Sequence, residues 1–392
     1  MTIKEVNTVC FVGAGTMGCA NSLVAAVSGY KAVIYDVAKE SLEKVAQIHA
    51  EMGAYLVGSG YCTAEELAAS AARITCEDDL TVATADADLV SESVVEELSV
   101  KRKVHRELDK VCPAKTILTT NTSALLVSDI EDVVERGDRF AALHSHLGSP
   151  LIDIVGGPRT SATTIDVLMR YVLSLNSMPL LLHKENRGYV LNALIGPVVS
   201  TAMMLVIEGT ASTEDVDRAW MKYRRAPMGP FGMMDLFGLN VVYDGWQYRA
   251  PDQVADAVRQ KILAFLEPYI GRGELGSKTR QGFYSYPNPA YEQPGFLDAS
   301  TDVSIPNCAM TTALISNAIL LASNDIADSD EIDRAWTVGM NLDTGPFGML
   351  DEMGVDAFLR LLSSPVSSMS PEDVVLIEQY LAQVEDGARV NQ

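Results

Sequence analysis

The chain has 392 residues, and 48% of them are hydrophobic, which predicts two or three folded domains with sizeable cores and excludes a disordered chain. Its 52 acidic and 30 basic residues give a net charge of −22, so its surface repels nucleic acid and anionic membranes, and we expect neither as a partner. We also expect no membrane-spanning segment and no signal peptide. Six scattered cysteines without a C-x-x-C pair indicate reduced thiols in a cytoplasmic protein and no metal site.

A glycine-rich turn follows the first predicted strand. Residues 9–12 form an apolar run, the turn follows, and a helical pattern and a second predicted strand at 32–35 come next. A strand, a glycine turn, a helix and a strand in this order give the pattern G-x-G-x-x-G its meaning as a dinucleotide-binding fingerprint. The binding residues that this pattern predicts are Gly13, Gly15, Thr16, Met17 and Gly18.

Asp36 ends the second predicted strand. A carboxylate at this distance from the glycine turn can accept hydrogen bonds from both ribose hydroxyls of NAD. The next residues, 37–39, contain no arginine that would bind the 2′-phosphate of NADP. NAD is therefore the expected cofactor.

The rest of the first half alternates predicted strands and helices. Helical spacing covers residues 39–57, 63–73 and 97–108, and Thr63 with Glu66 is expected to form a capping box. Further strands are expected at 74–75, 87–90, 116–120, 139–144, 151–155 and 179–183. This alternation predicts an α/β Rossmann-type domain, which is a parallel sheet with helices on both faces.

From residue 186 onward the pattern changes to long helices that contain an internal repeat. The segment GTASTEDVDRAW (209–220) matches DIADSDEIDRAW (325–336), and GPFGMMDLFGL (229–239) matches GPFGMLDEMGV (345–355). A proline-containing link ends near residue 300. We therefore expect a Rossmann-like NAD-binding domain at 1–185, followed by two tandem all-α domains at 186–300 and 301–392.

The repeat also separates structural residues from functional ones. A single substrate site cannot use both copies in the same way, so we interpret the Gly-Pro-Phe-Gly-Met turns, Asp235 and Asp351 as capping and packing devices. Asn192 differs, because its counterpart in the second copy is Cys308. The fold therefore does not require the amide of Asn192.

The order of motifs along nearly the whole chain resembles the L-3-hydroxyacyl-CoA dehydrogenase family. The matching stretches are FVGAGTMG, DLVSESVVEELSVK, ILTTNTSAL, RFAALH, RGYVLNALIGP, MGPFGMMDLFGL and GSKTRQGFY. The resemblance implies NAD-dependent oxidation of a short-chain L-3-hydroxyacyl-CoA to the 3-oxoacyl-CoA. In single-copy members the helical domain dimerises, so the duplication implies either a pair of helical domains within one chain or a homodimer.

The resemblance also implies roles for individual residues. It places Ser123 at a serine that hydrogen-bonds the substrate oxygen, His144 at the catalytic histidine, and Asn192 at a substrate-side asparagine. Four more residues match positions near the cofactor and the substrate: Glu96, Lys101, Asn121 and Lys278. Histidine titrates near neutrality, so His144 can take the hydroxyl proton while hydride leaves for the nicotinamide.

Several of these residues also have a simpler interpretation. Glu96 and Lys101 could form an ordinary solvated pair on a helix, and Lys278 could pack one domain against another. Asn121 could shape a turn, because asparagine bonds to its own backbone. His146, two residues after His144 on the same strand face, is the main alternative to His144 as the base.

The chain departs from the family pattern between His144 and Gly157. The family has aromatic residues and Asn-Pro after its histidine, and later a glutamate that orients the imidazole; here the Asn-Pro is missing. Counted without gaps, the glutamate position falls on Gly156. If the segment is a few residues shorter, Asp153 takes that position, and we prefer this alignment because the strand pattern Leu-Ile-Asp-Ile-Val survives it. The simpler alternative is that Asp153 is a surface acid.

A second departure concerns the substrate. The phosphates of CoA call for lysine or arginine, yet residues 45–72 contain neither, and Lys44 and Arg73 only flank them. Relatives that act on small free hydroxy acids such as gulonate or carnitine share the fold. A small hydroxy acid without CoA, or an acyl group on another carrier, therefore stays a second hypothesis. A catalytically silent NAD-binding protein is the third.

Overall fold

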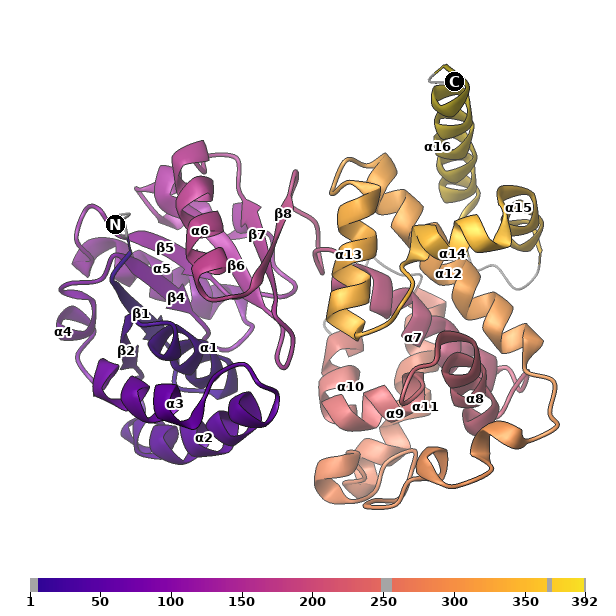
Figure 1. Cartoon of the computed structure of the whole chain (residues 1–392), viewed down its shortest axis with the longest axis horizontal. Helices are drawn as coiled ribbons and strands as arrows, with labels where there is room; N and C mark the ends of the chain where they lie inside the picture. The colour runs from indigo at the N-terminus through magenta and orange to yellow at the C-terminus, as the bar shows by residue number, and fades with distance from the viewer. Residues whose placement is uncertain (1–5, 248–255, 365–368, 391–392) are drawn as a thin grey trace. The chain divides into compact units, whose positions relative to one another are not determined.

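The computed structural model of the chain describes residues 6–247, 256–364 and 369–390 (Figure 1). It divides into two compact units. The first, which we call the N-terminal unit, contains the residues up to Val190 together with Asp325–Glu331. The second, the helical unit, contains Leu191–Asn324 and the chain from Ile332 onward.

The N-terminal unit is built on one sheet with the strand order β3-β2-β1-β4-β5-β6-β7-β8. Its first six strands are parallel, as the alternation of strands and helices predicts. The strands are β1 (Thr8–Val12), β2 (Lys31–Tyr35), β3 (Ile74–Glu77), β4 (Leu89–Glu92), β5 (Ile117–Thr120), β6 (Phe140–Ser145), β7 (Leu151–Gly156) and β8 (Met178–Leu182).

The expectation of a wholly parallel sheet is wrong for the last two strands. β7 runs antiparallel to β6, and β8 is parallel to β7. The reason is the length of the connection: only residues 146–150 join β6 to β7, and a parallel pair needs a crossover of a dozen or more residues. The hairpin brings residues of β6 directly opposite residues of β7.

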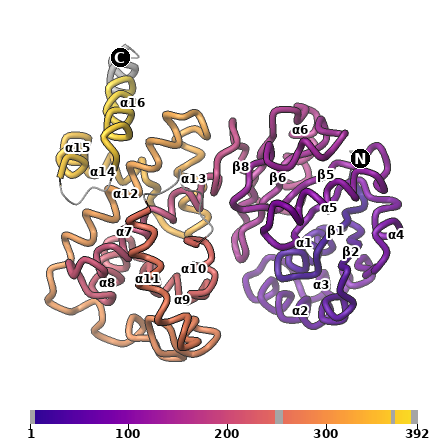
Figure 2. Tube along the Cα trace, turned by 180° about the vertical axis from the view of Figure 1, so that it is seen from behind, coloured from indigo at the N-terminus to yellow at the C-terminus, as the bar shows by residue number. Residues whose placement is uncertain are grey.

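Helices cover both faces of the sheet (Figures 1 and 2). One face carries α1 (Thr16–Val27), α2 (Lys39–Gly58) and α6 (Ala162–Ser174), which bury a common apolar core with the strands, and α3 (Ala64–Ser70), which packs on α1 and α2. The other face carries α4 (Leu80–Thr84) and α5 (Leu98–Val111). α3 begins with the predicted capping box, in which Thr63 and Glu66 bond each other's backbone N–H groups.

Side chains alternate between these two faces along each strand. In β6, Leu143 points into the core shared with α1, so the next residue, His144, points to the face that carries α5. Glu92 at the end of β4 lies on the same face, where it bonds two side chains of α5. The carboxyl ends of β1, β4, β5 and β6 meet at one edge of the sheet, where ligands bind in open α/β folds.

The helical unit contains helices only, apart from short 3-10 turns and isolated bridges in its described residues. They are α7 (Leu191–Ile207), α8 (Thr213–Arg224), α9 (Pro230–Phe237), α10 (Leu239–Gln247), α11 (Asp256–Arg272), α12 (Ser304–Ser323), α13 (Ser329–Met340), α14 (Pro346–Met353), α15 (Val355–Leu362) and α16 (Pro371–Val390). α12 packs along α7 and α8, so the first helix of each sequence repeat lies against the other.

The two sequence repeats use the same cap. The carboxylate of Asp217 accepts hydrogen bonds from the N–H groups of Phe231 and Gly232, and Asp333 accepts them from Phe347 and Gly348, all at 2.7–2.9 Å. Each pair of bonds satisfies the free N–H groups at the start of a helix that follows a Gly-Pro-Phe-Gly turn.

The expectation for Asp235 and Asp351 is correct only in the first copy. Asp235 accepts hydrogen bonds from the N–H groups of Phe283 and Tyr284 at 2.9 Å, so it is a packing device as predicted. Asp351 is exposed.

The expectation that no segment could span a membrane also needs correction. By length and composition alone, α12 is long and apolar enough to cross a bilayer, because it has 20 residues and no charge. Within the described residues, 67% of its most apolar window is buried inside the protein. A buried core helix passes the same test, and α12 packs as one against α7.

Candidate active site

The three glycines of the turn after β1 each meet a different requirement. Gly13 has a φ of +106°, and a Cβ there would lie 2.6 Å from the carbonyl oxygen of Ser93. A Cβ on Gly18 would lie 1.8 Å from the carbonyl oxygen of Gly13, so only glycine lets α1 pack this close to the turn. A Cβ on Gly15 would meet no atom within 4 Å. The protein itself does not require glycine at 15, which leaves the approach of a ligand as the reason for it.

The start of α1 provides an anion site beside Gly15. Gly15 is the N-cap of this 12-residue helix and has no side chain to bond the free N–H groups of the first turn. Asp36 lies next to the turn, because its carboxylate accepts hydrogen bonds from the N–H groups of Ala14 and Ala38 at 2.8 Å. Its oxygens keep lone pairs for ribose hydroxyls. Thr16 and Met17 open the helix. The predicted residues thus fit the pyrophosphate and the ribose of NAD.

We expect Gly15→Val to weaken the binding of NAD by at least about tenfold without lowering the thermal stability, because the Cβ of the new side chain meets no protein atom within 4 Å. Gly18→Val is the matched control, and we expect it to lower the melting temperature, since its Cβ would overlap the backbone of Gly13. Isothermal titration with NAD and thermal unfolding measure both effects. An unchanged NAD affinity in the Gly15 variant would contradict the assignment.

His144 and Asp153 form a buried pair at the end of the β6–β7 hairpin. They are directly opposite each other in the antiparallel register, and His144 Nδ1 lies 2.8 Å from Asp153 Oδ2. The predicted pairing is therefore present in the structure. Gly156, the alternative from the ungapped alignment, pairs with Ala141 at the other end of the hairpin. Because Asp153 is fully buried, the surface role considered for it is wrong.

Burial and hydrogen bonding act in opposite directions on this pair. Burial alone raises the pKa of Asp153, but the hydrogen bonds from His144 and His146 outweigh it and hold that pKa below its ordinary value. For His144, burial lowers the pKa by more than the bond to Asp153 raises it. At neutral pH the pair therefore consists of a carboxylate and a neutral imidazole, which is the form that can accept a proton.

His146 bonds the same carboxylate oxygen as His144. Its Nε2 lies 2.8 Å from Asp153 Oδ2, and its ring centre lies 4.4 Å from that of His144 in an edge-to-face arrangement. The expected alternative base is thus part of one cluster with the first. By distance alone the three side chains could also ligate a metal ion, since one donor atom of each lies within 4.8 Å of the others.

A buried network of charged side chains lies next to the candidate site. Lys101 is 1% exposed, and its Nζ lies 2.8 Å from Glu92 Oε1 and 3.2 Å from Glu96 Oε2. Glu92 also lies 3.1 Å from His105 Nε2, and these bonds outweigh burial and lower the pKa of Glu92 to about 2. Lys101 is therefore not a solvated partner of Glu96, and its place near the cofactor stays a prediction.

Glu96 holds the segment that carries Ser123. Its Oε1 accepts hydrogen bonds from the hydroxyl of Thr122 and from the N–H groups of Ser123 and Ala124, the latter two at 2.9 and 3.0 Å. Asn121 joins this segment to the histidine strand, because its Oδ1 accepts the N–H of Ser145 at 2.8 Å. Both residues thus position the site, while direct cofactor contacts by them stay predictions.

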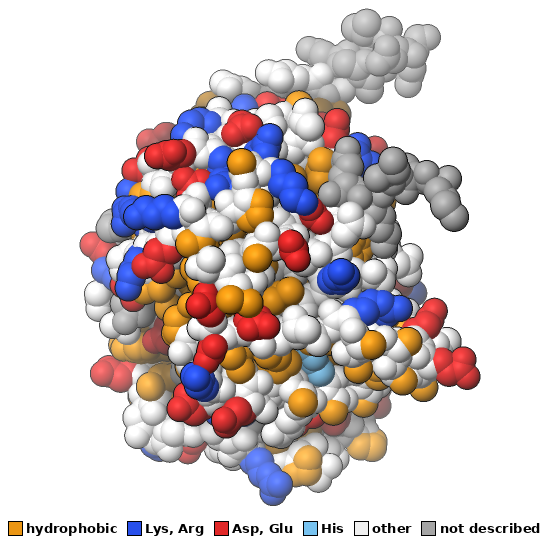
Figure 3. Space-filling model, turned by 90° about the vertical axis from the view of Figure 1, so that its left-hand side faces the viewer, with side chains coloured by type: hydrophobic (Ala, Val, Ile, Leu, Met, Phe, Trp, Pro, Cys, Tyr) orange, Lys and Arg blue, Asp and Glu red, His pale blue; other side chains and the backbone are white. Residues whose placement is uncertain are grey.

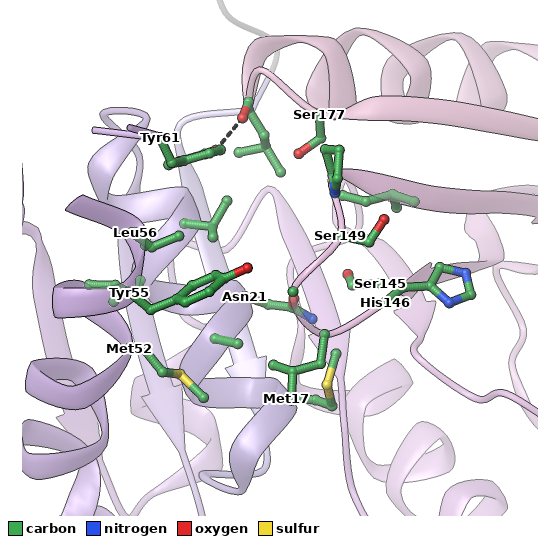
Figure 4. Close-up of a pocket in the computed structure, with 18 of the residues that line it drawn as sticks. Met17, Asn21, Met52, Tyr55, Leu56, Tyr61, Ser145, His146, Ser149 and Ser177 are labelled. Atoms are coloured by element: carbon green, nitrogen blue, oxygen red, sulfur yellow. Dashed lines mark hydrogen bonds between the residues drawn. The ribbon is translucent and has the colours of Figure 1, made fainter. Parts of the chain in front are cut away.

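An apolar pocket of about 340 Å³ adjoins the cluster on the opposite face of the sheet. Figure 4 shows Met17 and Asn21 of α1, Met52 and Tyr55 of α2, and Ser145 and His146 of the β6–β7 hairpin around it. The hydroxyl of Tyr61 donates to the carbonyl of Leu175 at its far end. Its size lies within the range of small-molecule sites. His146 is the residue that belongs to both the pocket and the cluster.

Two residues of the site escape sequence reasoning. Glu92 follows an apolar strand, but its partners come from α5. Tyr189 lies beside His144, with 5.2 Å between ring centres, and it adopts a φ of +50°. Its buried hydroxyl has no hydrogen-bond partner among the described residues. The sequence signal that could have found it is the glycine that precedes it in the Arg-Gly-Tyr segment.

Two predicted site residues belong to the helical unit. Asn192 is exposed in the first turn of α7, and Lys278 is exposed in the 3-10 turn Ser277–Thr279. Their roles at the substrate and the cofactor stay predictions.

Comparisons with known proteins match the chain over most of its length. Residues 8–186 match the NAD binding domain of 3-hydroxyacyl-CoA dehydrogenase, and residues 188–286 and 309–385 match the C-terminal domain of 3-hydroxyacyl-CoA dehydrogenase. Human mitochondrial hydroxyacyl-coenzyme A dehydrogenase is 32% identical over 72% of this chain and 91% of its own length. The 3-hydroxyadipyl-CoA dehydrogenase of Escherichia coli is 33% identical over 72% of this chain and 59% of its own.

Solved structures agree with the fold. The 3-hydroxybutyryl-CoA dehydrogenase of Escherichia coli aligns over 97% of this chain and 99% of its own with a TM-score of 0.78, at 21% identity. A diketoreductase described as acting on dicarbonyl compounds aligns over 72% of this chain and 99% of its own with a TM-score of 0.66, at 31% identity.

Proposed function

The chain belongs to the 3-hydroxyacyl-CoA dehydrogenase family, and from this premise we propose that it oxidises a short-chain L-3-hydroxyacyl-CoA with His144 as the base. The reaction gives 3-oxoacyl-CoA and NADH. The observation that supports the site is the buried hydrogen bond of 2.8 Å between His144 Nδ1 and Asp153 Oδ2, at the sheet edge that also carries the glycine turn.

Each side chain of the site has a different role in the transfer of the proton. His144 donates its Nδ1–H to Asp153, so Nε2 keeps its lone pair and can accept the proton of the substrate hydroxyl. NAD, when bound, accepts the hydride. The carboxylate of Asp153 then stabilises the imidazolium, and the hydroxyl of Ser123 can hold the oxygen as its charge changes. In the reverse direction the imidazolium returns the proton.

The pH dependence follows from the lowered pKa of His144. Alcohol oxidation needs the neutral imidazole, so its rate rises with pH through the pKa of His144 and levels off above it. Because burial lowers this pKa, the rising part lies below pH 6.5, the ordinary value for histidine. Reduction of the 3-oxo product needs the protonated form and has the opposite dependence.

A substrate without CoA is the second candidate, and one feature of the structure favours it. Most of α2 and all of α3 lie between residues 45 and 72, which contain no lysine or arginine. Of the two flanking bases, Arg73 already donates one N–H to the carbonyl of Ala26 at 3.1 Å, so few basic groups face a phosphate in that region. The similar diketoreductase, which is described as acting on dicarbonyl compounds, also supports this candidate.

One set of assays tests the function. Purified protein with NAD is offered 3-hydroxybutyryl-CoA, free 3-hydroxybutyrate and L-gulonate, and the absorbance of NADH is followed. We expect turnover of the CoA thioester at a kcat/KM at least about tenfold above that of the free acids. Faster turnover of a free acid would replace the proposal by the second candidate. A lack of turnover with all three, in both directions, would favour a silent NAD-binding protein.

We also propose that the helical unit is an internal pair of two copies of one domain, at 186–300 and 301–392. The C-terminal domain of the family matches twice, and both copies share the cap formed by Asp217 and Asp333. Trp220 and Trp336 occupy equivalent positions and pack against each other with 6.1 Å between ring centres, as residues near a two-fold axis do. Light scattering measures whether a second chain adds to this internal pair.

We further propose a cytoplasmic protein that acts on small molecules and binds neither nucleic acid nor membranes. All six cysteines are free, which suits a reducing compartment. The net charge of −22 opposes binding to polyanions. On the face drawn in Figure 3, acidic and basic side chains are interspersed with apolar ones, and this face carries no large basic patch.

A further inference from the structure

We propose that His146 is a positioning residue that sets the basicity of His144 by sharing the carboxylate of Asp153. The proposal rests on the proposed function, in which His144 is the base. It concerns a residue for which the sequence suggested only a competing role as the base itself.

The geometry makes the two histidines compete for one atom. Both imidazoles lie 2.8 Å from Asp153 Oδ2, while Oδ1 is buried and has no hydrogen-bond partner among the residues that the structure describes. If each histidine bonded a different oxygen of the carboxylate, neither hydrogen bond would weaken the other. Because they share Oδ2, the N–H of His146 already stabilises part of the negative charge that would otherwise favour a proton on His144.

The surroundings leave Asp153 as the dominant charge for both rings. Four groups lie around the ring of His144: Asp153 of β7, His146 of the hairpin, Glu96 of the loop before α5 and Tyr189 of the segment before α7. His146 faces Asp153, His144 and the pocket, whose lining contains tyrosines of α2, α6 and the loop at 59–61 but no charged side chain. Among the described residues, the charged and titratable groups that act on His144 are therefore Asp153, His146 and Glu96, and the cation Lys101 lies 3.2 Å from Glu96.

The position of His146 allows it to tune the pair without touching the alcohol. Its Nε2 is engaged by Asp153, and its side chain, 11% exposed, lies at the edge of the pocket next to Ser145 (Figure 4). Loss of its N–H would leave the carboxylate less stabilised. The carboxylate would then stabilise the imidazolium of His144 more strongly, and the pKa of His144 would rise. His146 thus makes His144 a weaker base than a simple His–Asp pair would be.

The test compares His146→Phe with the wild type. Phenylalanine keeps a ring against His144 but donates no hydrogen bond, so the rising part of the pH profile for alcohol oxidation should move up by about 0.5 to 1 pH unit. His146→Gln, whose amide can still donate to Asp153, should restore a profile close to that of the wild type. All assays contain a chelator, so that no metal ion held by the cluster contributes.

A second measurement separates this proposal from the proposed function. NMR titration of protein labelled in its histidine rings follows the pKa of His144 directly, with no need for a substrate, and it should show the same upward shift in the Phe variant. An unchanged or lowered pKa there overturns the proposal even if the enzyme is active. A loss of turnover in His146→Phe as large as that in a His144 variant also overturns it, because His146 would then be the base.

Discussion

Replacing His144 by glutamine is expected to lower kcat for the NAD-dependent oxidation by roughly 10²- to 10⁴-fold, the usual contribution of a positioned general base. Glutamine has a similar reach and can still donate an N–H to Asp153, so the hairpin should keep its geometry. It cannot accept the substrate proton. The Kd for NAD should change less than about twofold, because the cofactor residues lie on β1, α1 and β2.

The matched control for this variant is His183→Gln. His183 is also a histidine of the N-terminal unit, but it is part-exposed and pairs with Asp325 at 3.1 Å, outside the cluster. Its replacement should leave kcat unchanged. Stopped-flow measurement of NADH formation and titration with NAD separate chemistry from binding. If the His144 variant kept full activity, the base would have to be another group, and His146 would be the first to examine.

Local sequence patterns predicted the strands and the cofactor turn because both depend on neighbouring residues. An apolar run sets a strand, and the glycine turn with Asp36 lies within 30 residues of one βαβ unit. The direction of β7 was missed because an apolar run does not report direction. The short connection at 146–150 does report it, since it cannot form a crossover.

The catalytic pair was predicted only as one of two alignments. A strand pattern allows more than one register, and the antiparallel ladder selects one by placing Asp153 opposite His144 and Gly156 opposite Ala141. The network of Glu92, Lys101 and His105 was not predicted at all. These residues are neighbours only because α5 lies on the end of β4, and such contacts between elements leave no periodic pattern in the sequence.

The difference between patterns within one segment and contacts between separate elements also limits what the sequence says about the substrate. The turn from Gly13 to Gly18 and Asp36 recognise the cofactor with parts of one continuous segment. In the proposed reaction the alcohol is bound by Ser123 and His144, which come from separate segments, and Asp153 holds His144 through its hydrogen bond to Nδ1. The absence of lysine and arginine between residues 45 and 72 is visible in the sequence, but its effect on substrate binding depends on how α2 and α3 lie. The cofactor was therefore easier to predict than the alcohol.

Replacing Asp153 by asparagine is expected to lower kcat by roughly 10²- to 10⁴-fold, although Asp153 does not touch the substrate. The amide is nearly the same size, so packing is kept, but the charge that stabilises the imidazolium is lost. If the amide turns its NH2 group to His144, Nδ1 must accept, and the proton moves to Nε2. The histidine then presents the wrong tautomer to the alcohol.

Asp153→Glu restores the charge on a side chain one methylene longer, and it should recover part of the lost activity. The variant that lacks His146 provides the complementary comparison, because it keeps the charge and removes only the competing donor. We therefore expect Asp153→Asn to lower the pKa of His144, while His146→Phe raises it. NMR titration measures both shifts on one scale. Equal shifts in the same direction would mean that the carboxylate does not mediate between the two histidines.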